Sequence, residues 1–370
     1  MANIVCFSWR DKFHPSAGGA ETYITHMVEH LASQGHSVTV LCGNFPGAAH
    51  MQQDNGVTYI HRGNKFSLYL ELPLYFLRNL SKNTDIIIEN YNAWPFLVPL
   101  LNKKAIAIVH HIQKEEWKAE LGIIGPLLGS IARFLTSTLY KNASIVTVSQ
   151  SSFEQVEALG IPAEHITVIP NGIATKLTQY EYSAHPLNEG IRFIALGRVK
   201  RHKRLDLFLR SLSLIKDTLN VPVHFDIVGK GDDEARLEEI TKELGLESSV
   251  TFHGYVTEEK KVELLRRSHL HVQLSPREGW GITVTEAASQ GVPTLCFKVP
   301  GLQDSVKDDT GYIFPEGTAL ETVLPDIITR IQVQDQTYIS KVLAGIQFAS
   351  HFSWDKIREK WSEYIQTKSN

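Results

Sequence analysis

Short, almost uniformly apolar runs alternate with amphipathic stretches along the whole chain, and this alternation limits the fold more than any other feature. The apolar runs lie at 3–9, 37–42, 57–61, 85–89, 105–110, 144–149, 166–169, 191–196, 223–228, 250–256, 270–274, 293–297 and 311–314. Helical patterns occupy 19–34, 66–80, 124–140, 151–159, 204–217, 232–245, 257–268, 282–290, 318–332, 336–349 and 353–368. Strands that are apolar on both sides belong to sheets covered on both faces, so the pattern predicts doubly wound parallel α/β sheets.

Length and one polar stretch predict two domains. Single cores stop growing near about 250–300 residues, and this chain has 370. Residues 180–190 are polar, include Pro186 and lack periodicity, which is typical of a linker. We predict Rossmann-like domains at 1–185 and 186–350, with a C-terminal segment at 351–370. Two such domains normally enclose a cleft, and ligands bind beyond the carboxyl ends of the strands.

Composition excludes several classes of protein. The apolar share of 43% and the net charge of −3 are those of a globular protein with no bulk field for nucleic acid. Cys6, Cys42 and Cys296 have no metal-ligand spacing, so we expect buried thiols in a reducing compartment. No secretory signal pattern opens the sequence, and we expect a cytoplasmic protein.

The stretch 121–140 is long and weakly charged, as a membrane span would be. Arg133, Pro126 and internal glycines argue against a span, and an amphipathic helix fits better. The hypothesis is that this helix rests on the inner face of a membrane and gives access to a lipid-linked acceptor.

Two loops carry groups suited to a phosphorylated sugar. A strand ends at Gly197-Arg198, and five of the next six residues, through Arg204, are basic or histidine, which suits a diphosphate. Glu278 and Glu286 are eight positions apart, with a helix expected from Ile282, and carboxylates accept hydrogen bonds from sugar hydroxyls. A solvated basic loop is the lesser alternative for the cationic run. For the glutamates taken separately, a solvated Glu278 and a dipole-stabilised Glu286 are the better explanations.

A third loop, Gly18-Gly19, precedes the first helix, where backbone amides can approach an anion. A simple tight turn is an equal alternative. The GxGxxG fingerprint is absent, which counts against a nicotinamide dehydrogenase.

The ordered set of motifs resembles that of family-four retaining glycosyltransferases with the GT-B fold. The set covers essentially the whole chain and comprises Gly18-Gly19-x-Glu21, Val109-His110, Val148-Ser149, Val168-Ile-Pro-Asn171-Gly172, Gly197-Arg198 with Lys203, Asp226-Ile-Val-Gly229-x-Gly231, Phe252-His-Gly254-Tyr255, Glu278-x7-Glu286 and Phe352-Ser-Trp354. The resemblance implies two Rossmann-like domains facing a central cleft and a C-terminal helix that crosses back to the first domain.

The resemblance also implies residue roles. Arg198 and Lys203 would bind the donor diphosphate and stabilise its growing charge. Glu278 would contact the transferred sugar, Glu286 the ribose, and His110 or the adjacent His111 the reacting centre. Further donor contacts are expected from Gly18, Gly19, Gly229, Tyr255, Gly279, Trp280, Gly281 and Ile282, and acceptor contacts from Asn90, Asn92, Trp94 and His111.

The implied activity is retaining transfer of a hexosyl group from a nucleotide-diphosphate sugar to a hydroxyl of a glycan, glycolipid or small molecule. A UDP-sugar is favoured and GDP-mannose comes next. The sequence has no Asp-x-Asp motif, so we predict catalysis without metal or other cofactor. A sugar-nucleotide epimerase of the same fold and a non-catalytic carbohydrate-binding protein remain alternatives.

Overall fold

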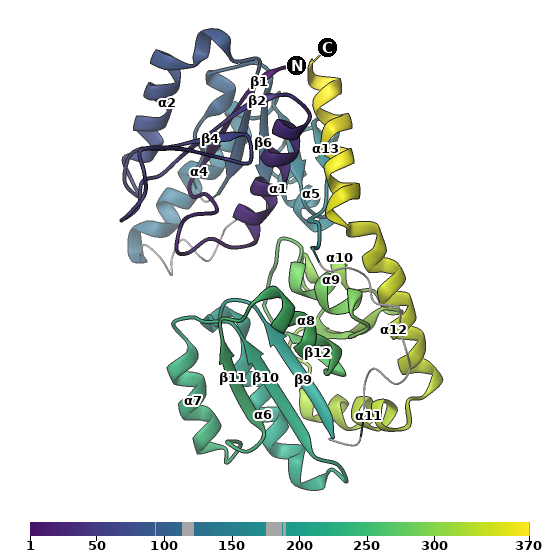
Figure 1. Cartoon of the computed structure of the whole chain (residues 1–370). Coiled ribbons are helices and arrows are strands. Elements are labelled where there is room, and N and C mark those ends of the chain that lie inside the picture. The colour runs from purple at the N-terminus through teal and green to yellow at the C-terminus, as the bar shows by residue number, and fades with distance from the viewer. Residues whose placement is uncertain (93, 113–121, 175–186, 188–189, 370) are drawn as a thin grey trace. The chain divides into compact units, whose positions relative to one another are not determined.

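The computed structural model describes residues 1–92, 94–112, 122–174, 187 and 190–369. The chain forms two compact units, one of residues 1–172 with 354–370 and the other of residues 173–353 (Figure 1). The predicted domain boundary at 185/186 lies outside the described residues. The chain rejoins the first unit at Trp354, whereas the third segment was expected to begin at residue 351.

The first unit is built on an eight-stranded sheet in the order β3-β4-β2-β1-β5-β6-β7-β8. All neighbours pair in parallel except β3 and β4. The strands are β1 (Asn3–Ser8), β2 (Ser37–Cys42), β3 (Met51–Asp54), β4 (Val57–His61), β5 (Ile86–Tyr91), β6 (Ala105–Val109), β7 (Ser144–Thr147) and β8 (Ile166–Val168). The polar edge strand β3 was not predicted from the sequence, whereas the other strands were.

Helices cover both faces of this sheet. They are α1 (Gly19–Ser33), α2 (Leu68–Asn79), α4 (Gly125–Leu139), α5 (Gln150–Glu157) and α13 (Trp354–Ser369). Phe7 of β1 packs on Phe76 of α2, with ring centroids 5.6 Å apart. The neighbouring residue Cys6 is also fully buried, on the opposite side of the pleat. Burial on both sides explains why the strands are apolar throughout.

The second unit contains a six-stranded parallel sheet in the order β11-β10-β9-β12-β13-β14. Its strands are β9 (Ile191–Leu196), β10 (Val223–Val228), β11 (Val250–Gly254), β12 (Leu270–Gln273), β13 (Thr294–Phe297) and β14 (Gly311–Phe314). The connecting helices are α6 (Leu205–Ile215), α7 (Glu234–Glu243), α8 (Glu258–Arg266), α9 (Ile282–Ser289), α10 (Leu302–Ser305), α11 (Leu320–Val333) and α12 (Gln336–Ala349).

Alternate residues of β9 enter two different apolar layers. Phe193 joins Phe208 of α6 and the other residues of the larger core, whereas Ile194 joins Leu265 of α8 and Ala287 of α9. The second sheet is therefore doubly wound, as the alternation of apolar runs and helices predicts. Its strands run in one direction, so the loops that follow β9 to β13 emerge at one edge.

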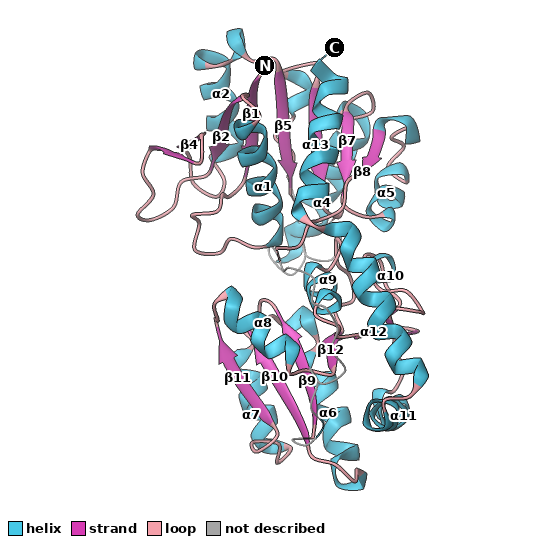
Figure 2. Ribbon diagram, turned by 45° about the vertical axis from the view of Figure 1, so that its right-hand side comes forward, coloured by secondary structure: helices cyan, strands magenta, loops and turns pink. Residues whose placement is uncertain are grey.

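The C-terminal helix α13 belongs to the first unit, as predicted, and packs beside α1 (Figure 2). Trp361 is 1% exposed, and its indole N–H donates to the Tyr23 hydroxyl at 3.0 Å. Tyr23 in turn donates to the Ile169 carbonyl at 2.8 Å. The indole thus fills the core and completes a chain of buried hydrogen bonds.

Replacing Trp361 with alanine should lower the free energy of unfolding of the first unit by about 3–5 kcal/mol, because it leaves a large cavity. Urea denaturation followed by circular dichroism measures this loss. Lys360→Ala, at an exposed position of the same helix, should change stability by less than about 0.5 kcal/mol. Equal effects of the two substitutions would contradict the packing role of Trp361.

Candidate functional site

Glycines bring the loops after β9 and β10 into backbone contact. A Cβ atom at Gly229 would lie 1.9 Å from the Gly197 carbonyl oxygen, and one at Gly231 would lie 1.9 Å from that of Val199. Gly197 and Gly229 also have φ angles of 110° and 131°, which side-chain-bearing residues rarely adopt. The amide of Val199 donates to the Lys230 carbonyl at 3.0 Å. This carboxyl edge of the sheet therefore depends on glycine.

The basic loop after β9 contains both paired and unpaired cations. Lys200 pairs with Asp232 at 2.8 Å and Arg204 with Glu316 at 2.6 Å. Arg198 is exposed, and it forms no ion pair with a carboxylate of the described residues. A pocket formed by the ends of β9 and β10 has Arg198, Lys203 and Gln273 as its polar lining. The loop thus presents cationic groups at the edge where a phosphate would bind.

Glu278 lies in the loop after β12 and is held by three neighbours. Lys203 Nζ and Gln273 Nε2 each lie 2.7 Å from Glu278 Oε1. Burial alone would raise the pKa of Glu278, but the charge and hydrogen bond of Lys203, with a hydrogen bond from Ser275, outweigh it and lower that pKa. Glu278 is therefore ionised, and its ion-pair partner Lys203 also lines the pocket.

Glu286 lies on α9, whose N-cap is Gly281 with a φ of 86° and whose first residue is Ile282. Lys261 Nζ is 2.7 Å from Glu286 Oε1. Burial raises the pKa of Glu286 above its ordinary value, although the charge of Lys261 opposes the shift. The two predicted carboxylates thus differ: the pKa of Glu278 is lowered and that of Glu286 is raised.

The remaining predicted donor contacts vary in exposure. Tyr255 is 84% exposed, whereas Trp280 is 6% exposed and packs on Phe352 with ring centroids 4.8 Å apart. Gly279 lies between Glu278 and Trp280 in the loop before α9. A Cβ at Gly301 would lie 2.1 Å from the Glu278 carbonyl oxygen, so the following loop also supports this segment closely.

In the first unit, Gly18 caps α1 and Gly19 is its first residue. The Gly18 amide donates to Glu21 Oε2 at 2.8 Å. The Glu21 side chain therefore already occupies one of the amide donors at the N-terminus of α1.

His110 follows β6 and is held by a directed chain of hydrogen bonds. The Ser8 hydroxyl donates to the Arg10 carbonyl at 2.6 Å and accepts from Asn90 Nδ2 at 3.0 Å. Asn90 Oδ1 then accepts from His110 Nε2 at 3.1 Å, which leaves Nδ1 as the acceptor nitrogen. Burial, with a smaller effect of the charge of His111, lowers the pKa of His110 to about 3. His110 is therefore a neutral imidazole at physiological pH.

The predicted acceptor residues lie at the ends of β5 and β6: Asn90 is in β5, Asn92 and Trp94 follow it, and His111 follows β6. Asn92, Trp94 and His111 are half-buried, and Asn90 is buried and oriented by His110. Glu89 is fully buried, accepts from the Phe96 amide at 2.6 Å and from the Tyr140 hydroxyl, and has a pKa raised to about 7 by burial. Glu89 thus holds the backbone at Phe96, in the segment that follows β5.

Sequence reasoning missed the partners of the key groups. Lys261, Gln273 and Ser8 bind Glu286, Glu278 and Asn90 respectively. A polar glutamine or serine at the end of an apolar strand is a signal that could have identified Gln273 and Ser8. Lys261 has no such signal, because lysine is common on helix surfaces.

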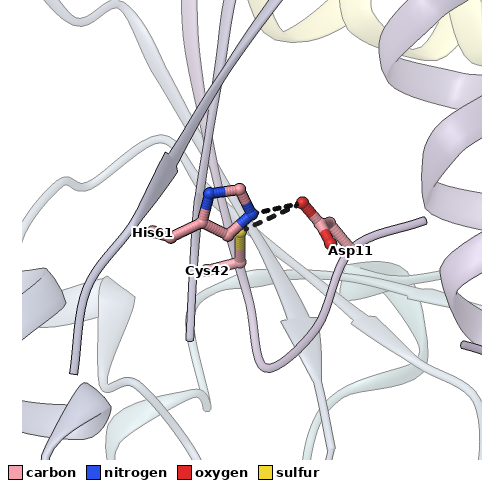
Figure 3. A group of neighbouring side chains, drawn as sticks. All are labelled: Asp11, Cys42 and His61. Atoms are coloured by element: carbon pink, nitrogen blue, oxygen red, sulfur yellow. Dashed lines mark hydrogen bonds and ion pairs between the residues drawn. The ribbon is translucent and has the colours of Figure 1, made fainter. Parts of the chain in front are cut away.

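One further cluster supports the loop that leads to Gly18. Asp11 Oδ2 accepts from His61 Nε2 at 2.7 Å and from the Cys42 thiol at 3.6 Å (Figure 3). His61 Nδ1 is 2.6 Å from the Ala49 carbonyl. The ligand atoms of Asp11, Cys42 and His61 lie within 4.8 Å of one another, but each takes part in a hydrogen bond, and three is one short of the four protein ligands of a structural zinc site. We interpret the cluster as a buried ion pair that anchors the loop.

Each of the two units matches a glycosyltransferase family model. Residues 183–329 match the family model described as glycosyl transferases group 1, and residues 17–177 match the model described as glycosyltransferase family 4. The N-acetyl-alpha-D-glucosaminyl L-malate synthase of Bacillus anthracis is 24% identical over 82% of this chain and 82% of its own. A phosphatidylinositol N-acetylglucosaminyltransferase component from Arabidopsis thaliana is 24% identical over 81% of this chain and 68% of its own.

Solved structures share the fold. Sucrose-phosphate synthase from Thermosynechococcus elongatus superimposes with a TM-score of 0.82 at 19% identity, covering 99% of each chain. Anabaena HepE, solved with UDP and glucose, gives a TM-score of 0.76 at 18% identity, covering 99% of this chain and 100% of its own. The two doubly wound units are those of a GT-B glycosyltransferase. The chain belongs to glycosyltransferase family 4 and is a nucleotide-sugar-dependent glycosyltransferase.

The Asp11–His61 pair predicts a pH-dependent contribution to stability. Burial alone would lower the pKa of His61, but the hydrogen bond and charge of Asp11 raise it above its ordinary value. Because the pKa of His61 is higher in the folded state than in the unfolded state, the pair stabilises the fold fully below about pH 6.5. This contribution is lost as the pH rises through the folded-state pKa. The difference in melting temperature between the wild type and His61→Gln should therefore be larger at pH 6 than at pH 9.

Thermal denaturation at the two pH values measures that difference. His50→Gln, which removes an exposed imidazole in the same unit, serves as the control and should leave the melting temperature nearly unchanged. A gap between wild type and His61→Gln that widens toward pH 9 would refute the ion-pair interpretation.

Proposed function

We propose that this glycosyltransferase transfers a hexosyl group from a UDP-sugar, with GDP-mannose as the next candidate donor, to a hydroxyl group. The acceptor would be a glycan, a glycolipid or a small molecule, and the anomeric configuration would be retained without metal. One observation carries the proposal: exposed Arg198 lies beside Lys203 at a glycine-lined carboxyl edge of the second sheet, where Lys203 already contacts Glu278.

The donor would bind to the second unit. Arg198 offers bidentate contacts to the diphosphate and Lys203 a compact charge, and both would stabilise the negative charge that develops as the glycosidic bond breaks. Ionised Glu278 would accept hydrogen bonds from the sugar, and Glu286 from the ribose. The UDP in the HepE structure supports UDP as the first nucleotide to test.

The transfer itself would break the bond between the sugar C1 and the β-phosphate oxygen and form one between C1 and the acceptor oxygen. The proton of the acceptor hydroxyl would pass to the departing phosphate, on the same face of the sugar. His110, neutral with Nδ1 as its acceptor nitrogen, would accept a hydrogen bond from a hydroxyl rather than donate a proton. No side chain is required as a nucleophile.

Arg198→Ala should reduce kcat by about 10²- to 10³-fold, because a developing charge loses a preorganised partner. A thermal-shift screen with UDP, GDP and ADP first identifies the base, since a ligand at a hundred times its Kd adds about 2.7 kcal/mol. Arg204→Ala is the charge-matched control, because Arg204 is paired with Glu316, and its effect should be much smaller.

Several outcomes of the same assay would contradict the proposal. Conversion of the nucleotide-sugar into its epimer with no acceptor present would favour an epimerase, and unchanged turnover in Arg198→Ala would favour a non-catalytic sugar-binding role. Activity abolished by EDTA and restored by magnesium would refute metal independence. Proton NMR of the product would show an inverted anomeric centre if the reaction does not retain configuration.

We further propose that α4 rests on the cytoplasmic face of a membrane. Gly122–Leu139 is long and apolar enough, by length and composition, to cross a membrane. The helix instead buries its small residues against its own sheet, and Thr136 bonds to Tyr91 at 2.9 Å. Leu127 (63%), Ile131 (39%) and Phe134 (67%) of the helix are exposed, as are Ile123 (98%) and Ile124 (60%) of the 3-10 turn Gly122–Ile124 just before it. A helix that buries small residues and exposes large apolar ones suits a lipid surface. The similarity to a phosphatidylinositol N-acetylglucosaminyltransferase component is consistent with a lipid acceptor.

Leu127→Ser combined with Phe134→Ser should weaken binding to vesicles of phosphatidylcholine and phosphatidylglycerol at least tenfold, by removing apolar area from the contact. Vesicle sedimentation measures this binding. Leu214→Ser, at a 67% exposed position of α6 in the second unit, is the matched control. Wild-type protein that does not sediment with vesicles would contradict the membrane proposal and leave the transferase proposal intact.

A further inference from the structure

Lys261 of α8 joins two carboxylates of very different exposure. Its Nζ lies 2.7 Å from Glu286 Oε1 and 2.8 Å from Glu258 Oε2. The side chains of Lys261 and Glu286 are 15% and 12% exposed, whereas that of Glu258 is 66% exposed. In this group of three residues, Lys261 and Glu286 form a largely buried pair, and Glu258 lies on the solvent side of Lys261.

The local sequence places Lys261 at this position. Thr257 caps α8 and accepts from the Lys260 amide at 3.3 Å, so the helix starts immediately after it. Lys260 and Lys261 then point in different directions: Lys260 pairs with exposed Glu263 at 2.7 Å, whereas Lys261 reaches across to α9. Two adjacent lysines thus have opposite environments, which gives the chain its own matched control.

The charge of Lys261 matters because Glu286 is buried. Burial favours the protonated acid and raises the pKa of Glu286, and Lys261 is the cation that opposes this shift. The pKa of Lys261 is itself raised, since its two carboxylate partners outweigh the effect of burial. A protonated carboxyl group donates one hydrogen bond and loses acceptor capacity, so it binds hydroxyl donors less well.

Titratable groups on the other elements packed against α9 have partners of their own. His271 of β12 lies 3.1 Å from Thr294 Oγ1, Arg266 of α8 donates to Gln290 at 3.0 Å, and Lys341 of α12 donates to the Asp308 carbonyl. Within the described part of the chain, Lys261 is the cation that forms an ion pair with Glu286. The ionisation of Glu286 therefore depends mainly on this lysine.

We propose that Lys261 is a positioning residue for the donor, which keeps the Glu286 carboxylate ionised and oriented to accept hydrogen bonds from the ribose hydroxyls. A carboxylate oxygen that accepts one N–H still has a second lone pair, so Lys261 and a ribose hydroxyl can share Oε1. This role rests on the proposed function, in which Glu286 holds the ribose. The new element is the role of Lys261, which contacts the Glu286 carboxylate and not the nucleotide.

The test compares Lys261→Met with Lys260→Met, which removes the same charge from the same helix. Isothermal calorimetry measures the Kd of UDP for each variant between pH 6.5 and 9. At pH 6.5 the Kd of Lys261→Met should exceed that of Lys260→Met, by at most about tenfold for each unit by which the loss of Lys261 raises the pKa of Glu286. The ratio should fall toward pH 9, where Glu286 ionises without its lysine, and Lys261→Arg should restore wild-type binding.

A double-mutant cycle separates this role from a general effect. In a Glu286→Gln background, Lys261→Met should cause no further loss of UDP binding, because the carboxylate through which Lys261 acts on the ribose is absent. Wild-type binding of UDP with equal Kd for Lys261→Met and Lys260→Met at every pH would overturn this proposal alone. Absence of binding by the wild type to UDP, GDP and ADP alike would overturn the proposed function and this proposal with it.

Discussion

Coverage of both sheets by helices on both faces is the constraint on which the rest of this structure depends. Strands such as β1 and β9 place alternate side chains in two apolar layers, which leaves little room for chemistry inside the sheet. Polar groups therefore gather in loops at the carboxyl edge. Because the strands of the second unit are all parallel, these loops lie together without long excursions of the chain.

Close backbone packing at this edge gives the loops their shape. Gly197 and Gly229 lie so near each other that a single Cβ would collide with a carbonyl, so the loops after β9 and β10 act as one surface. Lys200, Lys203 and Arg204 of the β9 loop each pair with a carboxylate from another loop, whereas Arg198 forms no ion pair with a carboxylate of the described residues. Lys203 also lines the pocket. A ligand phosphate would therefore meet Arg198, a cation that has no carboxylate partner among the described residues, beside lysines that are already paired.

The sequence predicted most of the fold. Strands and helices were located because apolar periodicity depends on local residues, and β3 was missed because Met51–Asp54 is short, polar and paired at a sheet edge. The positions of Arg198, Glu278 and Glu286 followed from their motif, whereas their electrostatic states did not. The two glutamates resemble each other in sequence, yet hydrogen bonds from Gln273 and Ser275 reach only Glu278 among the contacts of the described residues.

What the sequence determined by itself was the class of the protein: apolar runs and helical patterns specify two doubly wound units, and the order of motifs specifies the family. Only the tertiary structure decided which groups meet. Lys261 and Glu286 are 25 residues apart in the chain, and Asn90 and His110 are 20 apart, yet each pair is in hydrogen-bond contact. The physical reason is that periodicity records burial, a local property, whereas ionisation and hydrogen bonding depend on neighbours brought together by sheet order.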